Sequence, residues 1–324
     1  MNEFKRIQDI QQILDVRAPA GGPADAASQR VLVGIGDDAA VLCPPQGSLV
    51  LSVDTAVEER HFRRAWTTLQ KIGRRAAVAA LSDLAAMGAR PHSMLLSLLV
   101  PNTLTDSDLQ ALVTGVGTAA KEYDAPVVGG NLSAGGELSI TTTVVGELLD
   151  RPMLRSGARV GHRLYCSGPV GAAALGLELC TRGDMLAPFA APYLEHFLSP
   201  RAHIAEGRAL RTCASACIDV SDGLLQDLGH LCQASGVGAR IEYEALPLLP
   251  DFADACQALA LSPMPLALGG GDDYVLLFSI SPQIEPPVAS TPIGWVEEAS
   301  VGIRVERNGK ALDLSNLRPG FQHF

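Results

Sequence analysis

The spacing of apolar residues predicts three helices in the first half of the chain. Residues 67–89 form the longest of these patterns, which is rich in Ala and carries little polar surface in its second half. The Thr105–Asp108 segment has the spacing of a capping box and predicts the start of a helix that runs to about Tyr123. A short amphipathic helix is expected near the start of the chain, where apolar residues recur at three- and four-residue steps: Phe4, Ile7, Ile10 and Leu14.

Strands are expected between these helices, because apolar residues there either alternate with polar ones or form short uninterrupted runs. One strand ends near Asp54, so a carboxylate is expected where that strand stops. Pro101 closes a second strand, and Gly129-Gly130 is expected to form a turn at the end of a third. Residues 17–29, rich in Ala, Gly and Pro, predict a mobile loop. The expected strands of this half are residues 48–55, 93–100, 127–131 and 138–148.

The character of the sequence changes around residue 150, where Asp150-Arg151-Pro152 interrupts the pattern. We therefore expect two domains, residues 1–149 and residues 150–324. In the second domain, a strand at residues 163–167 leads through the Gly168–Gly171 turn into an Ala- and Leu-rich helix. Such a turn can bind phosphate at a helix N-terminus, but it lacks the Lys of a P-loop, so a plain strand-to-helix connection is favoured.

Further along, a Ser-Pro pair at residues 199–200 predicts a helix start, with Ser as the cap and Pro in the first position. The next strand ends at Asp219 and is followed by Ser221 and Asp222, one of which is expected to cap a Leu-rich helix. Asp219 and Ser221 lie two residues apart on an extended chain and so would share one face. A strand at residues 275–280 is expected after a run of three glycines and two aspartates.

The composition is that of a globular protein with an acidic surface. The 324 residues are 47% hydrophobic and 19% charged, which suggests two domains with sizeable cores. A formal net charge of −10 argues against nucleic-acid binding through a basic face. No apolar run approaches the roughly 20 residues of a membrane helix, and the N-terminus does not resemble a secretory signal.

The seven cysteines are scattered along the chain and include no Cys-x-x-Cys pair. Cys213 and Cys217 lie four residues apart, but no second pair and no nearby histidine complete a zinc site. We therefore expect reduced, buried thiols in a cytoplasmic protein.

The candidate chemistry centres on pairs of aspartates that follow glycines. Gly34–Val41 contains such a pair, and Gly269–Asp273 repeats the pattern. A single pair is more often a solvated turn than a site, but the recurrence favours a shared function. Adjacent carboxylates in such a turn repel each other unless a cation lies between them, and a hard divalent ion such as Mg²⁺ is the usual partner. If they converge, the following residues form a basin for several Mg²⁺ ions, as phosphoryl transfer requires: Asp37, Asp38, Asp54, Asp83, Asp219, Asp222, Asp272 and Asp273.

Two alternatives stay open for Asp83, which interrupts the apolar part of the 67–89 helix. A carboxylate on an apolar helix face is costly to bury without a partner. Asp83 therefore either faces solvent or caps a neighbour, or it is a metal ligand that reaches the same place as Asp38 and Asp54. No spacing in the chain indicates a Ser-His-Asp or Cys-His arrangement, so covalent catalysis is not favoured.

Jointly, these motifs resemble those of the thiamine-monophosphate kinase family. The resemblance extends from about residue 30 to the C-terminus, and the set is specific although each motif alone is weak. Aminoimidazole ribonucleotide synthase and selenophosphate synthetase share the ATP-binding scaffold of this family. The matching segments are Gly34–Ala39, Ser52–Thr55, His61-Phe62, Ser82–Gly88, Gly129-Gly130, Ile218–Gly223 and Gly269–Tyr274.

The resemblance implies a fold, a reaction and an assembly. The fold is α/β (α+β type), with the two-domain architecture of aminoimidazole ribonucleotide synthase. Its N-terminal sheet joins across a homodimer, and its C-terminal domain, a mixed sheet flanked by helices, closes the active-site cleft. The reaction is direct, Mg²⁺-assisted transfer of the γ-phosphoryl group of ATP to thiamine monophosphate, which gives thiamine diphosphate.

The resemblance also assigns three groups of site residues. Mg²⁺ would be bound by Asp38, Ser52, Val53 (through its backbone), Asp54, Asp83, Asp219 and Asp222. ATP would be contacted by Gly130, Asn131, Arg155 and Ser221. Thiamine monophosphate would be contacted by His61, Asp272 and Phe321, the last by stacking on a ring.

Three positions depart from the family pattern. Asn131 stands where the family usually has Asp, and its neutral carbonyl would hold Mg²⁺ less strongly. Asp272 stands where Glu is frequent, and Glu58-Glu59-Arg60 precedes His61 where a glycine is common. Two other hypotheses therefore stay open: an enzyme on the same scaffold with another acceptor, and a nucleotide-binding protein without turnover.

Overall fold

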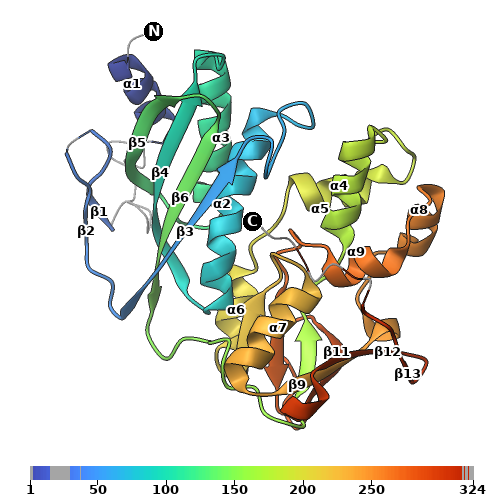
Figure 1. Cartoon of the computed structure of the whole chain (residues 1–324). Coiled ribbons are helices and arrows are strands. Elements are labelled where there is room, and N and C mark those ends of the chain that lie inside the picture. Colours follow the sequence, from blue (N-terminus) through green and yellow to red (C-terminus); the bar gives the residue numbers. More distant parts are fainter. Residues whose placement is uncertain (1–2, 15–29, 37, 316, 318–319, 321–324) are drawn as a thin grey trace. The chain divides into compact units, whose positions relative to one another are not determined.

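The computed structural model describes residues 3–14, 30–36, 38–315, 317 and 320. They form two compact units (Figure 1). The N-terminal unit consists of the described residues within 1–84 and 89–150, and the C-terminal unit of those within 85–88 and 151–324. Each unit is described by itself. The loop predicted at residues 17–29 lies outside the described residues.

The described strands of the N-terminal unit are β1 (Val31–Val33), β2 (Val41–Leu42), β3 (Ser48–Val57), β4 (Arg90–Pro101), β5 (Val127–Gly135) and β6 (Ser139–Leu148). β3, β6, β4 and β5 form a sheet in that order, and β1 pairs with β2 separately. β6 is antiparallel to both β3 and β4, whereas β5 is parallel to β4. The strands predicted from the sequence in this half are therefore confirmed.

Helices α2 (Leu69–Ala86) and α3 (Asp106–Glu122) cover one face of this sheet, and α1 (Glu3–Leu14) lies beside α3 (Figure 1). Every second residue of β6 is buried, from Ile140 to Leu148, as expected of a strand with one covered face. Leu84 of α2 lies against β6 at Gly146. The apolar residues that predicted these helices therefore form the core of the unit.

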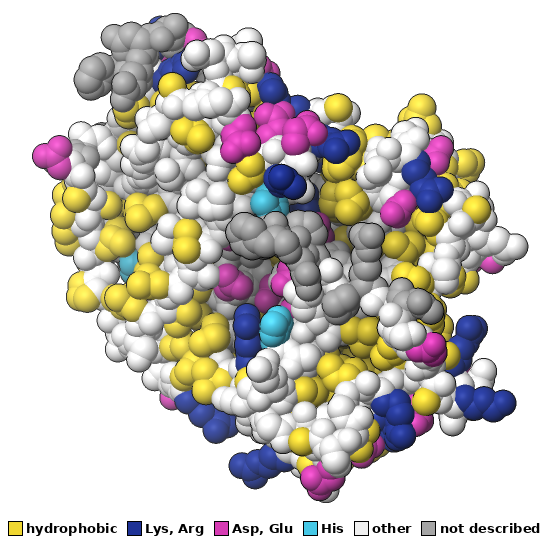
Figure 2. Space-filling model, viewed as in Figure 1, with side chains coloured by type: hydrophobic (Ala, Val, Ile, Leu, Met, Phe, Trp, Pro, Cys, Tyr) yellow, Lys and Arg dark blue, Asp and Glu magenta, His cyan; other side chains and the backbone are white. Residues whose placement is uncertain are grey.

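The opposite face of the sheet, called the open face below, carries exposed apolar side chains. On β3, Leu49, Leu51 and Val53 alternate with residues that face the helices, and they are 55%, 66% and 62% exposed. Leu95 of β4 is exposed on the same face. Figure 2 shows apolar side chains on the side of this unit where β1, β2 and β3 lie in Figure 1. β3 also forms one edge of the sheet.

The described strands of the C-terminal unit are β7 (Arg163–Cys166), β8 (Ala216–Asp219), β9 (Gly238–Glu242), β10 (Leu276–Ile280), β11 (Thr291–Glu297), β12 (Ile303–Arg307) and β13 (Lys310–Ala311). They form a mixed sheet in the order β13-β12-β9-β11-β7-β10-β8. β9 and β12 pair in the parallel sense, and the other pairs are antiparallel. All residues of β10 are buried, because β7 and β8 flank it and helices cover it.

The helices of this unit are α4 (Ala172–Arg182), α5 (Ala190–Leu198), α6 (Ile204–Leu210), α7 (Leu224–Ser235), α8 (Phe252–Ala258) and α9 (Pro263–Gly269), with short 3-10 helices at Tyr243–Ala245 and Ala299–Val301. Their apolar sides and the strands share one core. Leu164, Leu175, Leu228, Ile241 and Leu277 are fully buried in it.

Two local predictions, at Ser199 and at Gly129-Gly130, are wrong. Ser199 does not start a helix: its N–H donates to the Glu195 carbonyl, so Ser199 is the C-cap of α5, and α6 begins at Ile204. The proline that follows Ser199 marks the end of a helix instead of its first position. Gly129-Gly130 does not form a turn either, because β5 runs through both glycines to Gly135.

All seven cysteines lie among the described residues and are free, as predicted. Five are buried, whereas Cys43 and Cys213 are partly exposed. Burial raises the pKa of Cys232 and of Cys256 to about 11. Within the described chain, every helix is too short or too polar to span a membrane.

The capping box predicted at Thr105 is present. The Asp108 N–H donates to Thr105 Oγ1 at 3.1 Å, and the Thr105 N–H donates to Asp108 Oδ2 at 3.0 Å. Two N–H groups that the first turn of α3 cannot bond internally are satisfied in this way. The hydrogen bonds from Thr105 also keep the pKa of Asp108 below its ordinary value.

Replacing Thr105 by Ala should lower the free energy of unfolding by about 1 kcal/mol, because α3 loses its side-chain cap. Thr118→Ala is the matched control, since Thr118 is exposed in the interior of the same helix and Ala there should be neutral or slightly stabilising. Urea unfolding of both purified variants measures the two effects. A Thr105→Ala protein as stable as the wild type would contradict the role given to the cap.

Candidate functional site

A cavity of about 1030 Å³ lies on the open face of the N-terminal sheet. Side chains of β4, β5 and β6 line one side of it, and the segment between β1 and β2 lines the other. Asp38, Gly130 and Asn131 all contribute to its walls. The structure therefore brings these three predicted site residues together.

Gly130 is required at its position by the neighbouring strand. A Cβ there would lie 1.7 Å from the Leu96 carbonyl oxygen on β4, and the φ angle of Gly130 is +156°. The backbone leading to Asn131 is thus held closely against β4. Asn131 donates a hydrogen bond from Nδ2 to Ser133 Oγ at 2.9 Å, which orients its carboxamide.

On the other face of the same sheet, β3 and α2 bring predicted metal ligands together. Ser52 donates a short hydrogen bond from Oγ to Asp83 Oδ2. Asp54 lies two residues after Ser52 on β3 and so points to the same side. Its Oδ1 accepts the Thr55 N–H at 2.8 Å. Asp83 is therefore in contact with β3, on the side where Asp54 lies, whereas the side chain of Val53 points to the open face.

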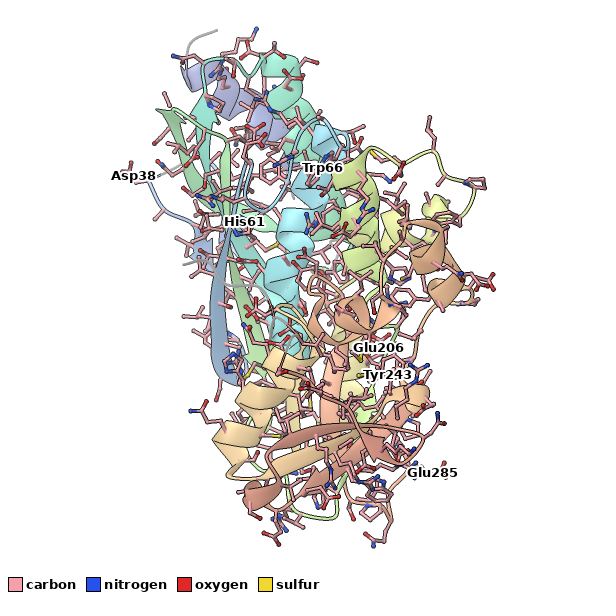
Figure 3. All side chains as sticks on the ribbon, turned by 45° about the vertical axis from the view of Figure 1, so that its right-hand side comes forward. Asp38, His61, Trp66, Glu206, Tyr243 and Glu285 are labelled. Carbon is pink, nitrogen blue, oxygen red and sulfur yellow. The ribbon has the colours of Figure 1, made fainter. Side chains whose placement is uncertain are left out.

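His61 lies in the loop that follows β3. The Val57 N–H donates to His61 Nδ1 at 3.0 Å, which assigns the proton of the neutral ring to Nε2. The His61 carbonyl accepts a hydrogen bond from the guanidinium of the buried Arg75 at 2.8 Å. Figure 3 shows His61 well apart from Asp38, which lies on the segment between β1 and β2.

In the C-terminal unit, two loops that carry predicted site residues lie side by side. Residues 219–223 begin at the last residue of β8, and residues 269–275 connect the end of α9 to β10, the strand next to β8. The Asp272 N–H donates to the Ser221 carbonyl at 2.8 Å. A Cβ on Gly271 would lie 2.3 Å from that carbonyl oxygen, so only glycine allows this approach. Ser221, its neighbour Asp222 and Asp272 therefore lie at one edge of the sheet.

The start of α7 is held by a buried carboxylate, Asp227. Its Oδ2 accepts the N–H groups of Ser221, Asp222 and Gly223 at 3.0, 3.1 and 3.2 Å. The predicted cap by Ser221 or Asp222 is wrong: Gly223 is the N-cap and offers no side chain, and Asp227 reaches back to the N–H groups instead. Burial, together with the charges of Asp219 and Asp222, raises the pKa of Asp227 to about 7.

A second buried carboxylate, Asp273, holds the other loop. Its Oδ2 accepts the Gly171 N–H at 2.6 Å, and its Oδ1 accepts the Ala173 N–H at 3.0 Å. These N–H groups belong to the N-terminus of α4, so the Gly168–Gly171 turn is the plain connection favoured from the sequence, and the protein's own carboxylate occupies its end. Burial raises the pKa of Asp273 to about 7 despite these two donors.

The start of α7 and the loop before it carry side chains that could bind a metal ion. Asp222, Asp227 and His230 each place one possible ligand atom within 4.8 Å of the others. His230 was not predicted, although its spacing of three residues from Asp227 puts both on one face of α7, whereas Asp222 lies in the loop before the helix. The negative charges of Asp219 and Asp222 raise the pKa of Asp227. A bound divalent cation would offset this excess of negative charge.

Comparison with known proteins identifies the family. Residues 36–148 match the family model of the AIR synthase related protein, N-terminal domain. The thiamine-monophosphate kinase of Aquifex aeolicus is 35% identical over 293 residues, which cover 90% of this chain and 92% of that protein. The enzyme of Salmonella typhimurium is 38% identical over 311 residues, which cover 91% and 92%. The chain belongs to the thiamine-monophosphate kinase family.

Solved structures agree with this assignment. A complex of AaThiL with AMPPCP and TMP is 32% identical and has a TM-score of 0.78, over 99% of this chain and 97% of its own. The hydrogenase maturation protein HypE, at 22% identity and a TM-score of 0.73, covers 91% of this chain and 98% of its own, and shares the fold alone. The predicted α/β fold of the aminoimidazole ribonucleotide synthase type is therefore confirmed.

In this member of the thiamine-monophosphate kinase family, most of the predicted site residues fall into three described groups, and His61 lies apart from them in the loop after β3. One lines the open-face cavity, one lies on the helix side of the N-terminal sheet, and one lies on the paired loops of the C-terminal unit. Arg155 is exposed before β7, where its carbonyl accepts a hydrogen bond from Ser235 Oγ at 3.0 Å. Phe321 and Asp37 lie outside the described residues, but Gly320 lies against the Asp222 carbonyl.

The two residues that hold the 219–223 and 269–275 loops in place were not identified from the sequence. Asp227 lies in a Leu-rich helix, and its position four residues after Gly223 was the available signal for a carboxylate that reaches back to the helix start. Asp273 was noticed only as the second member of an aspartate pair. Its partner, the N-terminus of α4, is 100 residues away in the sequence, so no local pattern could have indicated the contact.

Proposed function

We propose that this chain transfers the γ-phosphoryl group of ATP to the phosphate of thiamine monophosphate, giving thiamine diphosphate and ADP. The observation that carries the proposal is the similarity to the AaThiL complex with AMPPCP, an ATP analogue, and TMP, which extends over 99% of this chain. The proposal is supported by the relatives named thiamine-monophosphate kinase, which match over about nine tenths of both chains.

We also propose that the carboxylates of both units bind Mg²⁺. Ser52, Asp54 and Asp83 offer oxygen donors on the helix side of the N-terminal sheet, and Asp219 and Asp222 offer carboxylates beside β8. Oxygen donors of this kind suit Mg²⁺, which would neutralise charge on the phosphate oxygens during transfer. The further ligands are Asp38 and the Val53 backbone, while Asn131 brings a neutral carbonyl to the cavity wall.

The other assignments give side chains a role in binding and orientation. Arg155 presents an exposed planar guanidinium, which matches the geometry of phosphate oxygens in ATP. His61 carries its proton on Nε2 and can donate it in a hydrogen bond to the phosphate of thiamine monophosphate. Asp272 is an anion and suits the positively charged thiazolium ring of the same substrate. Gly130 and Ser221 would contact ATP, and Phe321 would stack on a ring of thiamine monophosphate.

We propose that the protein is a homodimer joined through the open face. The exposed side chains of Leu49, Leu51 and Val53 form an apolar row on β3, and such patches usually mark contacts between proteins. β3 is also an edge strand, which is a template for pairing with a second chain. Association there would bury the apolar row beside the cavity that contains Asp38.

The purified protein, incubated with ATP, MgCl₂ and thiamine monophosphate, should form thiamine diphosphate and ADP in equal amounts. Chromatography of the products measures both. The control omits thiamine monophosphate, and ADP should then remain at background. ATP binding without thiamine diphosphate would overturn the proposal and point to another acceptor or to a nucleotide-binding role.

Asp54→Asn and Asp222→Asn should each lower kcat about a hundredfold or more, because each removes a charge proposed to hold Mg²⁺ against the phosphates. Both residues lie at or near the surface, so thermal stability should change little. Asp254→Asn, an exposed aspartate on α8, is the matched control and should keep wild-type activity. Full activity in either of the first two variants would defeat the proposed metal sites.

Leu51→Lys should convert the dimer into a monomer, because it places a charge in the centre of the apolar row. Leu186→Lys is the matched control: Leu186 is 98% exposed on the C-terminal unit, and its replacement should leave the dimer intact. Light scattering coupled to size exclusion measures the mass of each protein. A monomeric wild type, or a dimeric Leu51→Lys variant, would contradict the proposed interface.

A further inference from the structure

The carboxylate of Asp272 is held by a neighbouring phenol. The Tyr274 hydroxyl donates a hydrogen bond to Asp272 Oδ1 at 2.9 Å. Tyr274 itself is buried, so its ring cannot move freely. A hydrogen bond to a charged acceptor is among the stronger ones in proteins, and it selects one orientation of the carboxylate.

This contact requires an unusual backbone. Asp272 and Tyr274 have φ angles of +65° and +54°, in the left-handed region that residues with side chains seldom adopt. Two such residues on either side of Asp273 cost free energy, and they persist only where surrounding contacts define the conformation. Strain of this kind concentrates at sites where a side chain must be held in one place.

Asp273 supplies the contacts that define it. Its two carboxylate oxygens accept the N–H groups of Gly171 and Ala173 at the start of α4, which anchors the middle of the strained segment. On both sides of Asp273 the backbone is also tied to the 219–223 loop, because the Tyr274 N–H donates to Val220 and the Asp272 N–H to Ser221. The segment therefore has little freedom to relax.

We propose that Tyr274 is a positioning residue for the phosphate acceptor: its hydroxyl orients the Asp272 carboxylate, and Asp273 anchors the backbone that makes this contact possible. The inference rests on the proposed function, because Asp272 is assigned to thiamine monophosphate only there. Asp is one methylene shorter than Glu, so its carboxylate has a shorter reach and depends more on the backbone and on Tyr274. An anion at this place attracts the thiazolium ring, which thiamine monophosphate carries and ATP lacks, so its orientation governs acceptor binding more than ATP binding.

Tyr274→Phe should raise the KM for thiamine monophosphate about tenfold, as expected for losing one hydrogen bond to a charged group. The KM for ATP and kcat should stay within about twofold of the wild type, since the reacting phosphates are not touched. Tyr193→Phe is the matched control, because it removes a hydroxyl that donates to the Pro250 carbonyl at 3.3 Å in the same unit. Its kinetic constants should not change.

Asp273→Asn tests the anchor. Asn keeps one oxygen acceptor but turns an N–H₂ group towards one of the two backbone donors, so the same KM should rise while kcat is kept. Melting temperatures are measured in parallel, because a purely structural role would lower stability without a selective effect on this KM. A fall in stability with an unchanged KM for thiamine monophosphate would remove Asp273 from the proposal.

A double-mutant cycle with Asp272→Ala decides whether Tyr274 acts through Asp272. The Asp272→Ala/Tyr274→Phe protein should have the same KM as Asp272→Ala alone, because the hydroxyl then has no carboxylate to orient. Multiplying effects, or a Tyr274→Phe enzyme with wild-type KM, would overturn the inference. An unchanged KM in Asp272→Ala would refute the assignment of Asp272 to thiamine monophosphate and the inference with it, whereas the proposed function would stand. A wild type that forms no thiamine diphosphate would refute the proposed function, and the inference would fall with it.

Discussion

The loops of the C-terminal unit depend on two buried carboxylates and the backbone N–H groups around them. Burying a carboxylate is costly, and burial raises the pKa of both Asp227 and Asp273 to about 7. The cost is offset by N–H donors from residues 221–223 at Asp227, and from Gly171 and Ala173 at Asp273. If either loop took another path, its buried carboxylate would lose these hydrogen-bond donors. The hydrogen bonds that compensate the buried charge therefore also fix the conformation of the loop.

The same arrangement leaves an electrostatic imbalance that is useful for a phosphoryl-transfer site. Asp219 and Asp222 both raise the pKa of Asp227, which means that each lies close enough to repel the charge of Asp227. A divalent cation bound there would relieve the repulsion, and its affinity would then be linked to the stability of the loop. Asp227 links the two, because its carboxylate accepts the backbone N–H groups of the loop and is also repelled by the charged side chains of Asp219 and Asp222.

The sequence was most informative where structure is local. The capping box at Thr105 and the alternation along β3 and β6 both depend on residues close in sequence, and both are present. The error at Gly129-Gly130 comes from a contact between distant segments. Gly130 was expected in a turn because glycine favours turns, whereas the Leu96 carbonyl of the adjacent strand requires it within β5. In the same way, no pattern around residue 273 indicates the start of α4.

In the candidate site, too, the sequence predicted local features better than contacts between distant segments. Residue chemistry identified the carboxylates, but only the sheet order shows which face each one takes. Ser52 and Asp54 point towards α2, whereas Asp38 lines the cavity on the open face. One of the two alternatives for Asp83 was a metal ligand that reaches the same place as Asp38, but within the described chain Asp38 and Asp83 lie on opposite faces of the N-terminal sheet.

β3 connects these two faces. Because successive side chains on a strand point to opposite sides, one strand presents Ser52 and Asp54 to the helices and Leu51 and Val53 to the open face. A shift of its pairing with β6 by one residue would exchange the two sets and destroy both surfaces. The register of this edge strand is therefore shared by the proposed metal ligands and the proposed dimer interface. A contact that holds β3 from the open face would also hold Ser52 and Asp54 in place on the other.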